Sequence, residues 1–227
     1  MKIGIIGGTG GMGEGLALRW CVNHDIVIGS RDASKAYVAA EEYKKKAIAY
    51  YNNTLNGSIN GDENSKLVGY CDVIVLCIPY ENSISIVASI ASNLRDDSIV
   101  VCPIVPMSKD SNGFIYLPMH EHKESAAEQV NKVLKDNNKN ARVVAALHNI
   151  SDVKLRRINN IIDSDVLVCS DDKDAASVVS ELVKEIKNLK PLYLGPLSLS
   201  YQVESITPML LNVAKNNGIK NPGIRIV

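Results

Sequence analysis

The sequence predicts an α/β fold with a doubly wound parallel sheet, and three observations support this. Short apolar, β-branched runs alternate with longer segments of helical period along the chain, which is typical of strands covered by helices on both faces. A glycine-rich segment directly follows the first apolar run. The chain has 227 residues, of which 46% are hydrophobic, so it is long enough to bury a sizeable core.

The first two strand–helix units follow from this periodicity. The apolar run at 2–6 is expected to form a strand, and a segment of helical period at 13–22 follows the glycines. A second apolar run at 25–29 precedes an expected helix at 33–51. The polar stretch 52–66 contains two Asn-Gly pairs, which favour turns, so it is predicted to be a loop.

The alternation continues beyond this loop. The apolar run at 72–78 is expected to be a strand before a helix at 82–94, and another strand is expected at 98–102. The segment 103–122 carries three prolines and a glycine, so it cannot be one regular element throughout. We expect an ordered excursion near the sheet edge there.

The rest of the chain completes the pattern without an internal repeat. Helices are expected at 123–136, 173–188 and 202–217, and strands at 142–146, 166–169 and 192–194. The apolar residues Met209, Leu210, Leu211 and Val213 of the last helix are predicted to fill the core, and a dimer seam is the alternative.

The glycine-rich segment has the spacing of a phosphate-binding turn between a strand and a helix. The pattern G-x-G-x-x-G is formed by Gly8, Thr9, Gly10, Gly11, Met12 and Gly13. The first glycine permits a tight bend, the second lets a pyrophosphate approach the backbone, and the third allows close packing of helix on strand. The pyrophosphate would rest on amides at a helix N-terminus. This setting predicts a Rossmann-type dinucleotide site, with a purely structural glycine turn as the alternative.

The end of the second strand indicates which dinucleotide would bind. An NAD site typically has Asp or Glu there to accept from the ribose 2′-hydroxyl, but this chain reads Gly29-Ser30-Arg31. Arg31 offers a planar donor fork, Ser30 a hydroxyl, and Lys35 a charge on the first turn of the next helix. Asp32 is expected to cap that helix. The set favours the 2′-phosphate of NADP, and a solvated basic turn is the alternative.

Composition limits the partners. Acidic and basic residues number 25 each, so no net field attracts nucleic acid or an anionic membrane. Five cysteines occur without a C-x-x-C pair, mostly in apolar segments, which favours a reducing cytoplasm. No signal peptide and no apolar run of membrane-spanning length are apparent. The loop motif His120-Glu121-His122 lacks the spacings of a zinc site, so no metal is predicted.

Several stretches together resemble a known family. They are GGTGGMGEGLALR (7–19), the Gly29-Ser30-Arg31 turn, IPYE (78–81), PIVP (103–106), AALH (145–148), GPLS (195–198) and VESITP (203–208). The chain with these motifs is similar to NADPH-dependent coenzyme F420 reductases, also called F420H2:NADP oxidoreductases. The resemblance spans nearly the whole chain.

The resemblance implies reversible hydride transfer between C4 of the nicotinamide and C5 of a deazaflavin, with both rings stacked in one cleft. The cofactors carry this chemistry, and the protein orients them and excludes water. No dedicated nucleophile is expected. Along the chain, the boundary between a nucleotide-binding part and a smaller C-terminal part is expected between 151 and 165. We therefore expect an NADP-binding part at 1–150 and a small part at 151–227 that helps to form the second-cofactor cleft.

The resemblance assigns roles to individual positions. Thr9, Gly10 and Met12 would meet the pyrophosphate, and Ser30, Arg31 and Lys35 the 2′-phosphate. The ribose and nicotinamide would be flanked by Ile78, Pro79 and Tyr80. The deazaflavin side would be formed by Pro103, Ile104, Val105 and His148, which follow strands at the carboxyl edge of the sheet. His148 would donate to a deazaflavin carbonyl or to the ring region that gains charge on reduction. A histidine bonded to a backbone carbonyl is the alternative.

The chain departs from the family pattern near the second cofactor. It has Asn149 and Ser151 after the histidine, where the family commonly has Thr and Pro, and Tyr80 where the family often has Trp. A different acceptor, such as a flavin, a ferric chelate or an imine, is therefore one alternative. An NADP-sensing module without turnover is another.

Overall fold

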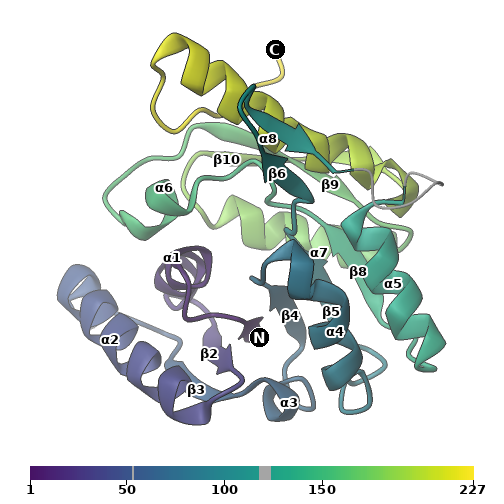
Figure 1. The fold of residues 1–227 in the computed structure, drawn as a ribbon. Coiled ribbons are helices and arrows are strands. Elements are labelled where there is room, and N and C mark those ends of the chain that lie inside the picture. The colour runs from purple at the N-terminus through teal and green to yellow at the C-terminus, as the bar shows by residue number, and fades with distance from the viewer. Residues whose placement is uncertain (53, 118–123) are drawn as a thin grey trace.

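The computed structural model describes residues 1–52, 54–117 and 124–227. Within them, an eight-stranded sheet carries helices on both faces, as predicted (Figure 1). The strands of this sheet are β1 (Lys2–Ile6), β2 (Asp25–Ser30), β3 (Ile59–Glu63), β4 (Val73–Leu76), β5 (Ile99–Cys102), β8 (Arg142–Ala145), β9 (Ser164–Cys169) and β10 (Leu189–Gly195). The helices are α1 (Gly11–Trp20), α2 (Ala33–Tyr51), α3 (Asn64–Leu67), α4 (Tyr80–Ala91), α5 (Ala126–Asp136), α6 (Asp152–Arg156), α7 (Lys173–Lys184), the short η1 (Leu197–Leu199) and α8 (Ser200–Asn217). A separate hairpin consists of β6 (Met107–Lys109) and β7 (Phe114–Tyr116).

The strand order reverses beside β1. The order is β10-β9-β8-β5-β4-β1-β2-β3, and β1 to β5 and β8 run parallel. The chain moves from β1 outward to β3 and then places β4 on the other side of β1. An open α/β sheet binds its ligands at such a reversal, outside the carboxyl ends of the strands.

The last two strands depart from the parallel arrangement that was predicted for the whole sheet. β9 and β10 are parallel to each other, but β9 pairs with β8 in the antiparallel sense at Ala145 and Cys169. Parallel pairing needs a long crossover, usually a helix, whereas α6 between β8 and β9 has five residues. The chain turns at the carboxyl edge through Leu147, whose φ of 70° is unusual for a bulky residue. Both strands, from the C-terminal 151–227, thus extend the sheet that the N-terminal part begins.

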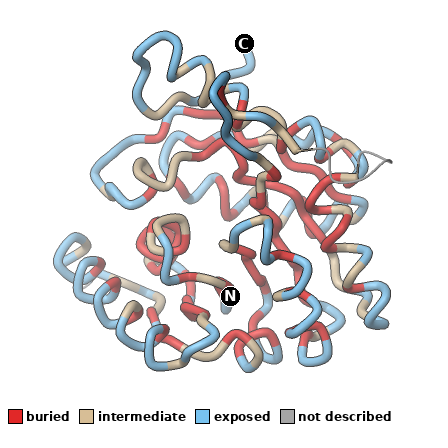
Figure 2. Tube along the Cα trace, viewed as in Figure 1, coloured by how far each residue is buried: buried red, intermediate tan, exposed pale blue. Residues whose placement is uncertain are grey.

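Side chains on the two faces of the sheet pack into two separate hydrophobic cores. Ile3 and Ile5 of β1 belong to the core that includes α1, α2 and α7, whereas Ile6 belongs to the core with α3, α4 and α5. Figure 2 shows the central strands as mostly buried. This burial on both faces explains the nearly continuous apolar runs in the sequence.

The predicted loop at 52–66 contains β3 and α3, so that prediction is wrong. In β3, Ile59 is a buried apolar residue, while Gly61 lets α2 approach closely. A Cβ at Gly61 would lie 2.5 Å from the Ala36 carbonyl carbon. An edge strand with so few apolar residues carries no hydrophobic period for the sequence to reveal.

The excursion predicted at 103–122 contains the β6–β7 hairpin, which packs against α8. Its residues 118–122 lie outside the described part of the chain, as does the first residue of the helix predicted at 123–136. The other predicted elements are present with bounds shifted by a few residues: α1 begins at Gly11 and α4 at Tyr80.

The apolar stripe of α8 does not fill the core, contrary to the prediction. Met209 and Val213 are 50% and 44% exposed, and Leu210 and Leu211 are half-buried. Among the described residues, no helix combines the length and the apolar character that crossing a bilayer would require.

Candidate functional site

The glycine turn joins β1 to α1 where the strand order reverses. Gly7 turns the chain with a φ of 68°, and the Gly8 amide donates to the carbonyls of Ile5 (3.1 Å) and Gly29 (3.0 Å). A Cβ on Gly13 would lie 2.5 Å from the Gly8 Cα, so this glycine is required for the close approach of helix and strand. The positive φ that a tight bend needs lies one residue before the predicted Gly8.

The amino end of α1 is open to an anion. Gly10 is its N-cap, in an extended conformation and without a side-chain cap. A Cβ on Gly10 would have the Gly7 carbonyl oxygen as its nearest neighbour, at 3.8 Å. The first amides of a helix, here those of Gly11 and Met12, have no intrahelical acceptor and carry the positive end of the macrodipole. Together with the exposed Thr9, they fit a pyrophosphate.

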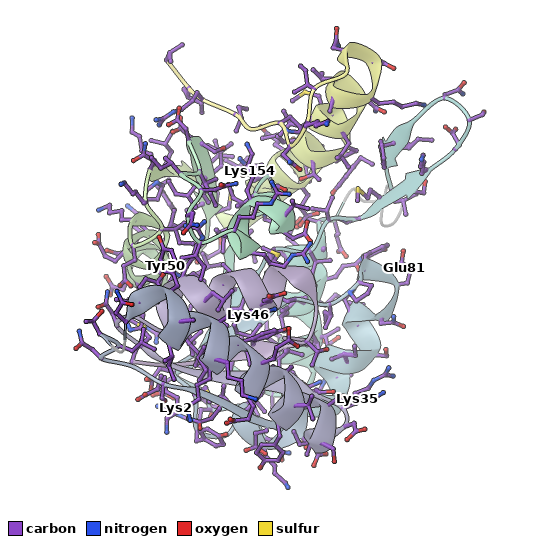
Figure 3. The ribbon with its side chains drawn as sticks, turned by 90° about the vertical axis from the view of Figure 1, so that its left-hand side faces the viewer. Lys2, Lys35, Lys46, Tyr50, Glu81 and Lys154 are labelled. Carbon is purple, nitrogen blue, oxygen red and sulfur yellow. The ribbon has the colours of Figure 1, made fainter. Side chains whose placement is uncertain are left out.

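The residues predicted for the 2′-phosphate lie together where β2 meets α2. Ser30 ends β2 and is half-buried, and Arg31 and Lys35 are exposed. Among the described residues, no hydrogen bond or ion pair engages the side chains of Arg31 and Lys35. Asp32 caps α2, as predicted, because its carboxylate accepts from the Ser34 amide at 2.9 Å. Figure 3 labels Lys35 near the start of α2.

The segment after β4 lies beside the glycine turn. Ile78 Cγ2 is 2.7 Å from the position that a Cβ on Gly7 would take. Pro79 is the N-cap of α4, and Tyr80 is its first residue. Burial raises the pKa of the half-buried Tyr80, and Glu204 adds to this effect. The structure therefore brings the predicted nicotinamide-side residues next to the predicted pyrophosphate turn.

The segments predicted for the second cofactor follow the adjacent strands β5 and β8, where Cys102 pairs with Ala145. Pro103 and Ile104 are buried, and Val105 is half-buried. The structure therefore brings these three residues and His148 to the same edge of the sheet.

His148 itself is buried and neutral. It is 5% exposed, and neither ring nitrogen has a well-formed hydrogen bond among the described residues. Burial lowers the pKa of His148 to about 3, and the Cys102 carbonyl opposes this effect. A neutral imidazole has one donor and one acceptor nitrogen, so His148 can donate one hydrogen bond and accept another.

A pocket of about 250 Å³ opens beside His148. Its other lining residues are Asn149, Ile150, Ser151, Thr207, Leu210, Leu211, Ala214, Ile219, Asn221 and Pro222. The hydroxyl of Thr207 donates to the His148 carbonyl at 2.7 Å, which fixes α8 against this edge. The α8 residues of this lining were not predicted as site residues, although the VESITP motif at 203–208 was an available signal.

The two residues that depart from the family pattern have local partners. The Asn149 amide donates to the Asp165 carbonyl at 2.8 Å, and its Oδ1 has no partner among the described residues. Ser151 caps α6 and donates to Asn221 at 3.3 Å. Both side chains thus help to hold the walls of the pocket.

Glu204 is a buried carboxylate that was not predicted as a site residue. It lies on α8, is 0% exposed, and accepts from the amides of Ala126 (3.0 Å) and Ala127 (3.2 Å) and from the Tyr116 hydroxyl (3.0 Å). Burial raises the pKa of Glu204 to about 7, although these three donors oppose the effect. It joins α8, α5 and the hairpin at one point.

The motif His120-Glu121-His122 lies outside the described residues. Within the described ranges, no group of three or more His, Cys, Asp or Glu side chains has a metal-binding arrangement.

The fold is shared with solved structures of other proteins. A protein of Arthrobacter sp. FB24, proposed to be an F420-dependent NADP reductase, has a TM-score of 0.78 at 21% identity, over 100% of this chain and 99% of that one. A pyrroline-5-carboxylate reductase of Coxiella burnetii has a TM-score of 0.55 at 14% identity, over 96% of this chain and 72% of that one. At such identities, the likeness establishes the fold alone.

Sequence comparison is more specific. Residues 2–106 match the family model described as NADP oxidoreductase, coenzyme F420-dependent. The chain is 37% identical to the F420-dependent NADP reductase of Methanothermobacter thermautotrophicus, over 100% of this chain and 94% of that protein. It is 35% identical to the enzyme of the same name from Methanocaldococcus jannaschii, over 100% of this chain and 98% of that protein. The chain therefore belongs to the family of F420-dependent NADP reductases.

Proposed function

We propose that the protein transfers a hydride between NADP(H) and coenzyme F420. The family membership carries this proposal, and the reversal of strand order between β1 and β4 supports it. When both cofactors are bound, F420H2 and NADP⁺ give F420, NADPH and a proton, so that one hydride moves from deazaflavin to nicotinamide. The protein's part is to hold the two rings and to exclude water.

The NADP half uses the glycine turn and the β2–α2 corner. The backbone from Gly8 to Gly13 receives the pyrophosphate, because the space at Gly10 and the amides of Gly11 and Met12 fit an anion. Ser30, Arg31 and Lys35 bind the 2′-phosphate. Ile78, Pro79 and Tyr80 flank the ribose and the nicotinamide.

The deazaflavin half uses the pocket beside His148. Pro103, Ile104 and Val105 do not line this pocket, but they follow β5 at the same edge of the sheet and provide an apolar surface there. His148 donates to a deazaflavin carbonyl from a neutral ring. Both parts of the chain line the pocket: Ile150 belongs to residues 1–150, and Thr207 belongs to residues 151–227. This supports the division into an NADP-binding part at 1–150 and a part at 151–227 that helps to close the second-cofactor cleft.

The proposal extends to partners and location. The exposed Met209 and Val213 on α8 favour a homodimer. Nucleic acid is not an expected partner, because the net charge is zero and Lys44 and Lys46 pair with Glu41, Glu42 and Glu14. The five free cysteines suit a reducing cytoplasm.

The proposal is tested by mixing the purified protein with NADPH and one acceptor at a time, and following the loss of nicotinamide absorbance. The acceptors are F420, a free flavin, a ferric chelate and a cyclic imine. We expect turnover with F420 to exceed that with each of the others. Turnover with another acceptor alone would reassign the second pocket, and NADPH binding without any turnover would indicate a sensor.

A further inference from the structure

The short helix α6 lies against α1, directly beside the glycine turn. Figures 1 and 3 both show it close to α1, and Lys154 marks it in Figure 3. Its Leu155 packs on Gly15 so closely that a Cβ at position 15 would clash with the Leu155 side chain. The NADP site proposed above does not use α6, so the placement of this helix needs another explanation.

Arg19 fixes α6 in this position. This arginine of α1 is 8% exposed. Its Nε donates to the Leu155 carbonyl at 3.0 Å, and its Nη2 donates to the carbonyls of Lys154 (3.2 Å), Arg157 (3.0 Å) and Asn160 (3.0 Å). A planar guanidinium that spans the end of a short helix and the loop after it restricts both. The side chains of α6 therefore have a defined place relative to the amino end of α1.

Arg156 is the cation that this arrangement brings to the turn. Its Nε and Cζ lie 3.1 and 3.4 Å from the position that a Cβ on Gly11 would take. Gly11 is the first residue of α1, so the guanidinium is beside the amides that face an anion.

Asp152 forms an ion pair with Arg156 and would compete with a bound pyrophosphate for the guanidinium. Its Oδ2 is 3.3 Å from Arg156 Nη2, and the same oxygen lies close to the Cβ position of Gly11. A carboxylate there is repelled by a bound pyrophosphate, whereas the guanidinium is attracted to it. The Arg156 side chain is 41% exposed, so its guanidinium can turn from the carboxylate towards a phosphate.

We propose that Arg156 is a further dinucleotide-binding residue, which donates to the NADP pyrophosphate at the amino end of α1, with Arg19 as the residue that positions it. This rests on the NADP site proposed above. It adds a side chain from the C-terminal part to a site otherwise built from the N-terminal part. The C-terminal part would then contact both cofactors.

The test measures direct binding of NADPH to the full-length protein by its change in fluorescence, without F420. Arg156→Ala is expected to raise the Kd for NADPH about tenfold, because a charged donor to phosphate is lost. Arg156→Lys should lie between this variant and the wild type, since an ammonium keeps the charge but not the fork. Arg157→Ala is the matched control, because it removes the neighbouring exposed arginine and keeps the carbonyl that Arg19 uses. It should leave the Kd unchanged.

Adenosine 2′-monophosphate separates this proposal from the 2′-phosphate assignment, because it has the ribose phosphate but no pyrophosphate. Arg156→Ala should leave its Kd unchanged, and Arg31→Ala should raise it. Asp152→Asn should tighten NADPH about threefold, since a competing charge is removed. Loss of α6 packing alone would not tighten binding.

An unchanged Kd for NADPH in Arg156→Ala would overturn the proposal. So would a loss in Asp152→Asn as large as in Arg156→Ala, which would assign both residues to packing. A raised KM for F420 in Arg156→Ala, with NADPH binding intact, would instead assign the guanidinium to an anionic group of the second cofactor. If Arg31→Ala also leaves both nucleotides unaffected, the NADP site itself is misplaced.

Discussion

At the scale of single residues, Arg31 is the residue proposed above to select NADPH over NADH. Arg31→Ala should weaken NADPH by about 1.5 to 3 kcal/mol, because one charged donor pair to phosphate is lost. NADH should bind nearly as before, since it has no 2′-phosphate. Titration of both nucleotides by fluorescence measures the difference, and Lys45→Ala, which removes an exposed cation on α2, is the control. Selectivity equal to that of the wild type would remove the 2′-phosphate from this corner.

Gly10 tests the pyrophosphate cradle. Gly10→Val should abolish most NADPH binding, because the side chain would occupy the space that the phosphate needs. The fold should tolerate it: the backbone at Gly10 is extended, and a Cβ there would have 3.8 Å to its nearest neighbour. A thermal melt close to that of the wild type, together with lost binding in a titration, is the expected result.

The contrast at Gly13 makes this prediction sharper. A Cβ on Gly13 would lie 2.5 Å from the Gly8 Cα and carbonyl oxygen, so Gly13→Val should lower the melting temperature as well as the affinity. Normal NADPH binding in Gly10→Val would show that the pyrophosphate does not lie over Gly10. Unfolding of this variant would contradict the open space inferred at Gly10.

The residue-scale features that the sequence could predict are local in the chain. The glycine spacing and the Asp32 cap depend on neighbours within a few positions, and both are present. Arg19 is different, because its carbonyl partners lie 135 to 141 positions away. No spacing rule encodes such a contact, so the link between α1 and α6 required the structure.

At the scale of elements, Glu204 joins three of them and gives the junction a pH dependence. Its pKa of about 7 lies above the ordinary 4.5, so the folded state binds the proton more tightly than the unfolded state. The free energy of unfolding should therefore decrease as the pH rises from about 4.5 to about 7. By linkage, the loss is roughly 2 to 3 kcal/mol.

Glu204→Gln should lack this slope, because an amide does not titrate. Urea melts of both proteins at several pH values give the difference directly, and carboxylates common to both cancel. A parallel pH dependence in the two proteins would contradict the raised pKa. Glu204→Ala should be less stable than the glutamine variant by about 1 to 3 kcal/mol at every pH, since two amides and the Tyr116 hydroxyl lose their acceptor.

The sequence could predict those elements that have a clear hydrophobic period. β1, β2 and α2 were predicted within a residue at each end, because both faces of the strands are buried and α2 has a long amphipathic pattern. β3 was missed because its residues INGDE pack through a glycine rather than an apolar side chain. The five residues of α6 are too few to show a period.

At the scale of the whole molecule, the sheet order assembles the site from distant segments. The turn after β1, the start of α4 and the residues after β5 and β8 meet at one edge because four parallel strands end there. The sequence could predict this edge from the alternation of strands and helices. It could not predict the reversal of β9, or that α8 would supply part of the pocket beside His148, because neither has a local signal.

The apolar stripe of α8 gives the last prediction, which concerns the assembly. Tyr201, Met209 and Val213 lie at intervals of four or eight residues, and they are 37%, 50% and 44% exposed. They therefore share one face of the helix. In a two-fold dimer each substitution occurs twice, so Met209→Glu brings two charges into one interface. We expect the dimer Kd to rise at least about 100-fold, as measured by sedimentation velocity over a range of concentrations.

Val38→Glu is the matched control, because Val38 is an apolar residue 71% exposed on α2, a different helix. It should leave the dimer intact. Met209→Glu should still bind NADPH, because the glycine turn and the β2–α2 corner contain no α8 residue. Its turnover with F420 should fall if the dimer holds α8 against the pocket, which Leu210 and Leu211 help to line. A wild-type protein that sediments as a monomer at every concentration would refute the dimer, and so would equal dissociation of both variants.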